Sequence, residues 1–274
     1  ALARGARVVS DGLVERIVTK GGRAVGVRGH LYNRPGVRKK GDRFEVRARR
    51  VVVACGGMHT PLLLQASRVG RRSGQVGRNL TLHPGFRMSA RFADEVRGWQ
   101  GAMQSVYSDA FEHERITMVG LFIPPAVVAA TLPGFGPEHA RRAARMPHYA
   151  MMGGMIHDDG GGVVRRGPGR EPRLSYRMAP RDRRAASKAI RLMAQTFFAA
   201  GAEEVYLPVL GHPPVDADGL ARVDLDAIPA RRLECSSQHP LGSCRMGVDP
   251  RTSVVDPDGK AWDVEGLYVV DGSI

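Results

Sequence analysis

The sequence of 274 residues lacks any apolar run long enough to cross a bilayer, which takes about 20 residues in a helix. Its longest apolar stretches, Val51–Ala54 and Leu121–Ala130, are short or interrupted by proline. We therefore expect no transmembrane segment within these residues. Ala1–Arg7 contain neither an initiating Met nor the apolar core of a signal peptide, so the printed chain is expected to start inside a domain.

Cysteine is scarce, and its three positions exclude the usual cysteine-based frameworks. The count is odd and no C-x-x-C occurs, which argues against a disulfide scaffold and a zinc cage. His157-Asp158-Asp159 imitates a set of metal ligands, but three adjacent residues at a glycine-rich turn cannot all face one ion. We expect no metal site, and we predict that Cys55 and Cys244 are buried small apolar groups. The cysteine usage favours a reducing compartment, so we expect a cytoplasmic protein.

Lysine is also scarce. Five of the 41 basic residues are lysines, and the arginines are spread along the chain. With 27 acidic residues the formal net charge is +14, which could attract nucleic acid. Aromatic residues make up 6% and do not interleave with the arginine pairs, so no platform for base stacking is visible. We interpret the charge as a solvated surface and expect no nucleic-acid partner. A basic nucleic-acid-binding module is the weakest alternative.

Short β-branched runs open the sequence and predict strands. They are Val8-Val9, Leu13–Thr19, Ala24–His30 and Phe44–Ala48, with Gly21-Gly22 as a turn and Asn33–Asp42 as an exposed hairpin tip. A further strand, Arg50–Cys55, ends abruptly in Gly56-Gly57. A helix to Ala66 is predicted next, with Thr60 as N-cap and Pro61 at the first position. Strand, glycine pair and capped helix are the layout of a site where backbone comes close to a ligand.

Alternating apolar and polar residues in the middle of the chain predict an antiparallel sheet. The expected strands are Phe86–Phe92, Met103–Tyr107, Ile116–Phe122, His148–His157, Val163–Arg165, Arg173–Met178 and, near the end, Leu267–Val270. Pro124-Pro125 and Pro133–Pro137 are interpreted as interruptions. Asp182–Ala200 is the clearest helix, with apolar residues at a 3–4 spacing and Gly201 after its end. Together these elements predict an α+β fold.

Motifs near the carboxy terminus resemble a known family. HPLGSCRMG (residues 239–247), SVVDPDG (253–259) and GLYVVDGS (266–273) resemble the signature of the glucose–methanol–choline (GMC) oxidoreductases. Two earlier segments agree in the same order. They are residues 51–61, with the glycine pair and Thr60-Pro61, and VGRNL (76–80) followed by His83-Pro84. Within the family, residues 99–109 resemble the long-chain fatty-alcohol oxidases and dehydrogenases.

The resemblance implies an α/β parent fold, in which a Rossmann-like FAD-binding domain joins a substrate domain with a mainly antiparallel sheet covered by helices. We expect residues 1–82 to form part of the FAD-binding domain, 83–246 the substrate-binding domain, and 247–274 a return to the FAD-binding domain. No G-x-G-x-x-G occurs in this chain, although the family seats the FAD pyrophosphate on such a loop. The family's second catalytic His or Asn would lie beyond residue 274. We therefore expect a chain that is truncated at both ends or completed by a separate chain.

By resemblance, His239 is the catalytic base. Histidine suits that role because its unperturbed pKa of about 6.5 lies near neutrality, although a His-Pro turn is often only structural. The same match implies seven cofactor-binding positions: Val14, Ala54, Gly56, Gly57, Asn79, Asp271 and Gly272. Each of them could instead be an ordinary strand or turn residue. The methionines Met146, Met151, Met152 and Met155 could line an apolar alcohol pocket or fill the core.

The resemblance implies an FAD-dependent oxidoreductase that oxidises a CH–OH group, with a long-chain aliphatic alcohol as its small-molecule substrate. His239 would accept the hydroxyl proton while hydride passes to FAD. The alternative is a non-catalytic fragment, or one half of a split enzyme, that cannot hold FAD alone.

Overall fold

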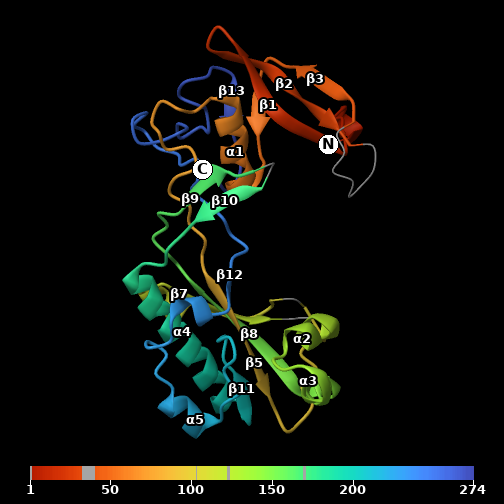
Figure 1. The fold of residues 1–274 in the computed structure, drawn as a ribbon, viewed down its shortest axis with the longest axis vertical. Coiled ribbons are helices and arrows are strands. Elements are labelled where there is room, and N and C mark those ends of the chain that lie inside the picture. Colours follow the sequence, from red (N-terminus) through yellow and green to blue (C-terminus); the bar gives the residue numbers. More distant parts are fainter. Residues whose placement is uncertain (1, 33–40, 103, 122–123, 169–170) are drawn as a thin grey trace. The chain divides into compact units, whose positions relative to one another are not determined.

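The computed structural model describes the chain except for residues 1, 33–40, 103, 122–123 and 169–170 (Figure 1). The chain forms two compact units. Unit 1 contains Ala1–Leu82, Gly160–Arg177 and His239–Ile274, and unit 2 contains His83–Asp159 and Met178–Gln238. Residues 160–177 and 239–246 therefore pack with unit 1, whereas the sequence analysis grouped them with the substrate-binding residues. That FAD belongs to unit 1 and substrate to unit 2 stays a prediction.

An antiparallel three-stranded sheet opens unit 1 and confirms three of the four strands expected there. Its described strands are β1 (Gly12–Lys20), β2 (Arg23–Leu31) and β3 (Arg43–Arg47), paired in that order. Gly21 and Gly22 both have positive φ, as the hairpin between β1 and β2 requires. The strand expected at Val8-Val9 is wrong, since the two valines are irregular and exposed with no strand to pair with. The expected tip at Asn33–Asp42 lies, except for its last two residues, outside the described residues.

A parallel strand pair and a helix form the second part of unit 1. β4 (Val51–Val53) pairs with β13 (Leu267–Val269), and α1 (Gly56–Ser67) follows β4 directly. The helix begins four residues before the expected Thr60, because Gly56 adopts a φ of 78° that lets the strand turn at once into the helix. Thr60 still serves the helix start, since its hydroxyl accepts a hydrogen bond from Cys55 N at 3.0 Å.

A short hairpin from the middle of the chain packs on α1. It consists of β9 (Val163–Arg166) and β10 (Pro172–Ser175). The side chain of Gln65 joins it to the helix, because its amide donates to Val164 O at 2.9 Å and accepts from Arg166 N at 3.2 Å. The core of unit 1 combines side chains from both ends of the chain, including Ile17, Leu64 and Leu267.

The described part of unit 2 is built on an antiparallel sheet, as the sequence predicts. The strand order is β11-β5-β8-β7-β6, and β12 pairs with β5 beyond the end of β11. The bounds are β5 (Gly85–Arg91), β6 (Tyr107–Ser108), β7 (Ile116–Leu121), β8 (Tyr149–Ile156), β11 (Glu204–Tyr206) and β12 (Cys235–Ser236). β6 keeps only the last residue of the strand expected at Met103–Tyr107, of which Met103 lies outside the described residues.

Helix α4 (Pro180–Ala199) covers one face of this sheet and confirms the clearest helix of the sequence. Asp182 accepts a hydrogen bond from Ala179 N at 3.3 Å and so completes its first turn. Gly154 of β8 lets the helix come close, because a Cβ at this position would lie 3.0 Å from Met193 Sδ. The sheet and α4 form the main core of unit 2.

Two helices that the sequence analysis missed pack near the other face. They are α2 (Pro125–Thr131) and α3 (Gly136–Ala144), each with proline in its first turn. The proline clusters were interpreted as interruptions, but proline is favoured at the first helical position, where its missing N–H costs nothing. Val128 and Leu132 pack with Tyr149, Met151 and Tyr206 of the sheet.

Short helices complete the fold: η1 (Leu2–Arg4), η2 (Glu112–Glu114), η3 (Met146–His148), η4 (Ala230–Arg232) and α5 (Ala217–Arg222). The α+β class is thus confirmed. None of the helices in the described ranges is both long and apolar enough to cross a membrane.

Candidate functional site

The start of α1 is joined to the end of the chain through one carboxylate. Asp271 Oδ2 accepts hydrogen bonds from Gly56 N at 3.1 Å and from Thr60 Oγ1 at 2.5 Å, while Oδ1 accepts from Ser273 N at 2.7 Å. A carboxylate is favoured there because the first N–H groups of a helix lack partners inside it. Partial burial raises the pKa of Asp271, but the hydrogen bonds from Ser273, Thr60 and Gly56 outweigh it and hold the pKa below its usual value. Asp271 is therefore a charged cap for α1.

The loop of residues 239–244, called the His239 loop below, lies along this same junction. Leu241 exchanges two backbone hydrogen bonds with Thr81, at 2.9 and 3.0 Å. Gly242 N donates to Gly272 O at 3.0 Å, and Cys244 N donates to Ser273 O at 2.6 Å. The loop is thus held between the segment that follows α1 and the last residues of the chain.

Close backbone contact explains the second residue of the glycine pair. A Cβ on Gly57 would collide with the carbonyl oxygen of Pro240, the residue directly after His239. Gly57 therefore allows the His239 loop to touch α1, whereas Gly56 supplies the positive φ for the turn. His239 itself is exposed and lies three residues beyond the end of β12.

The structure brings five of the seven expected cofactor positions to this junction. Gly57 and Gly272 contact the His239 loop directly, and Asp271 joins Gly56 to the segment that holds Gly272. Asn79 meets it through its backbone, since its carbonyl oxygen would lie 2.7 Å from a Cβ on Gly242. The amide side chain of Asn79 points to its own segment and donates to Gln75 Oε1 at 2.9 Å.

Val14 lies in a groove on the side of α1. The groove has a volume of about 630 Å³ and contains the β1 backbone from Gly12 to Arg16 in its wall. Residues of α1 form a mainly apolar second wall, with Leu62, Leu63 and Ala66, and the β9–β10 hairpin adds the charged residues Arg166 and Glu171. Ala54 immediately precedes Cys55 and is exposed between β4 and α1. The two remaining positions thus flank the same helix.

Two hydroxyl groups of this junction were not foreseen as site residues. Thr60 was predicted to be a cap only, yet it also donates to Asp271. Ser243 is fully buried and donates to Gly57 O at 2.5 Å. Two signals bear on Ser243: its place in the motif at residues 239–247, and Pro61, which cannot donate to the carbonyl four residues earlier in its helix.

The cysteines and histidines elsewhere offer less chemistry. Cys244 is fully buried, which raises its pKa to about 12. Cys55 is exposed, so the prediction that it is buried is wrong. In unit 2 the His83 and His157 rings lie 5.8 Å apart, and His157 Nε2 lies 3.0 Å from Thr117 Oγ1. Among the described residues, no group of three or more His, Cys, Asp or Glu side chains could hold a metal ion.

Comparison with known proteins places this geometry in a family. Two GMC oxidoreductase family models match residues 1–85 and 162–274, which together exceed half the chain. A GMC-type oxidoreductase of Mycobacterium tuberculosis is 35% identical over the whole chain, which spans 42% of that relative. A long-chain-alcohol oxidase of Arabidopsis thaliana is 26% identical over 84% of the chain, which corresponds to 34% of that enzyme.

A solved structure shares the fold. Formate oxidase of Aspergillus oryzae superposes with a TM-score of 0.72 at 16% identity, and the match covers 96% of this chain and 55% of that one. The chain therefore spans about half the length, or less, of the proteins it matches. The family models and the similar fold agree with the motifs, and the chain belongs to the GMC oxidoreductase family.

Proposed function

We propose that the complete protein oxidises a CH–OH group to a carbonyl, with FAD as the hydride acceptor and His239 as the general base. The observation that carries the proposal is the position of the His239 loop. It lies on the start of α1, between the glycine pair and Gly272, where backbone can come close to a flat ligand. Family membership supports the reaction class.

The residues of unit 1 fit part of an FAD site. The groove beside Val14 has the size of a small-molecule site, and its apolar wall suits an aromatic ring system. Gly56 leaves room for close backbone approach, because no heavy atom lies within 4 Å of where its Cβ would be, and the exposed Ala54 lies beside it. The formate oxidase that shares the fold carries FAD. When bound, FAD supplies the acceptor for hydride; this chain has no G-x-G-x-x-G to hold its pyrophosphate, so we propose that the rest of the protein supplies it.

His239 takes the substrate proton in this proposal. An imidazole can accept a hydroxyl proton near neutral pH if it lies within hydrogen-bonding distance of that hydroxyl. Its exposure leaves it accessible to substrate, while the anchored loop after it limits its movement. Removal of the hydroxyl proton makes the carbon a better hydride donor. His239 therefore accelerates hydride transfer from that carbon.

A long-chain aliphatic alcohol is the substrate that we propose. The Arabidopsis relative is a long-chain-alcohol oxidase. The methionine run splits between the two sides of the unit 2 sheet: Met152 packs against the core under α4, whereas Met151 belongs to the cluster with α2. Met155 pairs across the sheet with Thr117 and is only partly buried. Because they lie on opposite faces of one sheet, these methionines fill the core and do not line one alkyl pocket, so the relative alone supports the choice of substrate.

Replacement of His239 tests the proposal. In the complete, FAD-loaded protein we expect His239→Ala to slow flavin reduction by a long-chain alcohol about 10²–10⁴-fold, measured by stopped-flow absorbance. His113→Ala is the matched control, because His113 is an exposed histidine of unit 2 whose Nε2 lies 3.5 Å from Glu114 Oε1. A loss below about threefold at His239 would remove it from the mechanism.

The alternative, a chain that cannot hold FAD without a separate partner chain, has an observation of its own. β4 and β13 form a two-stranded parallel pair, and parallel sheets are normally larger and covered on both faces. Val52 and Val270 are more than half exposed there. An absorbance spectrum of the purified 274-residue chain separates the two proposals: bound yellow flavin in stoichiometric amount contradicts the alternative.

A further inference from the structure

Helix α1 contains a proline in its second turn, where an α-helix normally excludes it. Pro61 has no N–H, so the carbonyl of Gly57, four residues earlier, loses its helical donor. Gly57 is buried, and a buried carbonyl without a donor is costly. The position therefore requires a donor from elsewhere in the molecule.

Ser243 supplies that donor from 186 residues away in the chain. Its hydroxyl donates to Gly57 O at 2.5 Å, and the residue is completely buried. Its own carbonyl accepts from Gly77 N at 2.7 Å, so its backbone is fixed as well. The hydrogen bond that Gly57 O lacks because of Pro61 is thus supplied by Ser243, four residues after His239.

We propose that Ser243 is a positioning residue, and that its bond to Gly57 fixes the His239 loop at the reaction centre. The bond pulls the loop against α1 where the Pro240 carbonyl lies over Gly57. Without it, the loop keeps its backbone bonds to Thr81 and Gly272 but is no longer held to the helix. A shift of about 1 Å at a catalytic group can slow a reaction about 100-fold, so the bond bears on rate as well as on stability. The inference depends on the proposed role of His239.

Restoring the missing N–H provides the test. In the complete, FAD-loaded protein we expect Ser243→Ala to lower kcat about 10- to 100-fold, with less than about a threefold change in KM. Pro61→Ala returns an N–H that can bond to Gly57 O within the helix. That bond satisfies the carbonyl but does not tie the loop to the helix, so we expect Pro61→Ala to recover the stability that Ser243→Ala loses while kcat stays lowered about 10- to 100-fold, which a double-mutant cycle on both quantities measures.

Ser253→Ala is the matched control. Ser253 is also a buried serine of unit 1, and its hydroxyl donates to Asp249 O at 2.8 Å and to Gly247 O at 3.3 Å, not to α1. We expect this variant to lower the unfolding midpoint but to keep kcat. Equal losses of kcat in Ser243→Ala and Ser253→Ala would reduce Ser243 to a general structural role and overturn the inference.

The remaining outcomes separate the two proposals. If His239→Ala slows the reaction but Ser243→Ala does not, the positioning role fails and the proposed function stands. If Pro61→Ala restores kcat in Ser243→Ala, the loss came from the unsatisfied Gly57 carbonyl and not from the lost tie to the loop, and the positioning role is wrong. If His239→Ala has no effect, the proposed function itself fails, whatever Ser243 does.

Discussion

Asp271 in unit 1 and Glu204 in unit 2 are partly buried carboxylates whose pKa values are both lowered, but by different partners. Asp271 receives hydrogen bonds from a hydroxyl and from backbone N–H groups. Glu204 receives them from the Arg91 guanidinium at 2.8 Å and from the Tyr206 hydroxyl at 2.6 Å. Burial raises the pKa of each, and in each case the donors outweigh it.

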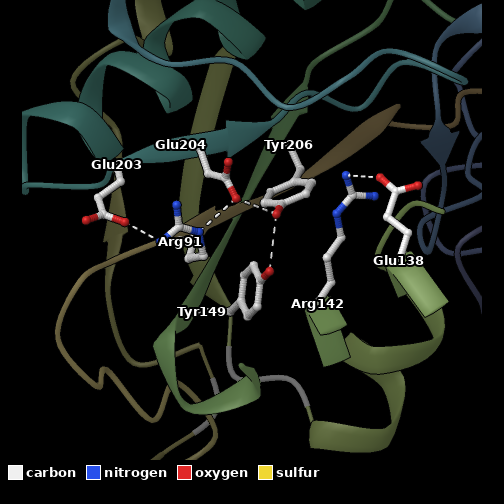
Figure 2. Close-up of polar contacts among 7 residues, drawn as sticks. All are labelled: Arg91, Glu138, Arg142, Tyr149, Glu203, Glu204 and Tyr206. Atoms are coloured by element: carbon white, nitrogen blue, oxygen red, sulfur yellow. Dashed lines mark hydrogen bonds and ion pairs between the residues drawn. The ribbon is translucent and has the colours of Figure 1, made fainter. Parts of the chain in front are cut away.

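Glu204 lies in a network of charged and hydroxyl side chains. Figure 2 shows Arg91 between Glu204 and Glu203, and the Tyr206 hydroxyl between Glu204 and Tyr149. Arg142 lies 5.7 Å from the Tyr206 ring centroid and pairs with Glu138 of α3. Glu204 thus has an ionised hydrogen-bond donor, Arg91, whereas the hydrogen-bond donors to Asp271 are all neutral. The charge of Asp271 is therefore stabilised by hydrogen bonds from neutral groups, whereas that of Glu204 also has an ion pair with Arg91.

The largest expected effect follows removal of the unit 1 carboxylate. Asp271→Ala leaves the donors Gly56 N and Thr60 Oγ1 without their acceptor, so we expect a loss of about 2–3 kcal/mol in the free energy of unfolding, measured with urea. Asp271→Asn keeps an acceptor and should lose about half as much. Equal losses in the two variants would contradict a role for Asp271 as the hydrogen-bond acceptor of α1.

The contribution of Asp271 to the stability of the fold should change with pH in one direction. Because its folded pKa is lowered, its stabilisation is present above the unfolded pKa of about 3.9 and is lost as the pH falls through the folded value. Asp271→Asn should therefore flatten the loss of stability below about pH 4.

A smaller effect is expected at the charged carboxylate. Glu204→Gln weakens the bond to Arg91, but Arg91 keeps its ion pair with Glu203, so we expect a loss of about 1–2 kcal/mol. The loss should shrink between about 0.05 M and about 0.5 M NaCl, whereas the effect of Asp271→Asn should hardly change. Glu203→Gln is the control, since its side chain is 45% exposed and its removal should cost little. If the loss of stability in Glu204→Gln does not change with salt, the claim that Glu204 depends on an ion pair and Asp271 does not is wrong.

The smallest effect concerns the tyrosine pair. Tyr206→Phe removes the donor to Glu204 and should cost about 1 kcal/mol near neutral pH. Burial and the neighbouring Glu204 raise the pKa of Tyr206, so its stabilisation is fully present below the unfolded pKa of about 10 and is lost as the pH rises further. Unfolding midpoints measured between about pH 8 and pH 11 should therefore fall less steeply for Tyr206→Phe; parallel curves would contradict this.

Periodicity in the sequence predicted the elements that depend on local pattern. The 3–4 spacing of Asp182–Ala200 gave α4, and alternation gave most of the unit 2 strands. Proline misled the prediction in both directions. It concealed α2 and α3, where it stands in the first turn, and it suggested a helix start at Pro61, where it lies inside α1. Proline fixes φ and removes a donor, but it does not reveal whether another segment replaces that donor.

The candidate site was predictable as motifs but not as contacts. The resemblance named His239, Asp271 and the glycine pair, and the structure brings their segments together. The bonds that join them, from Ser243 to Gly57 and from Thr60 to Asp271, connect residues 186 and 211 positions apart. No local pattern encodes such a pairing, because each partner is an ordinary small residue in its own segment.

The cap of α1 by Asp271 has a consequence for synthesis. Gly56 emerges from the ribosome 215 residues before the carboxylate that completes its helix start, a delay on the order of 10–40 s at typical rates of elongation. Unit 2 has all of its residues once Gln238 is made, while unit 1 still lacks its last 36. During that interval every residue of unit 2 has been made, whereas the first helix of unit 1 still lacks the carboxylate that caps it.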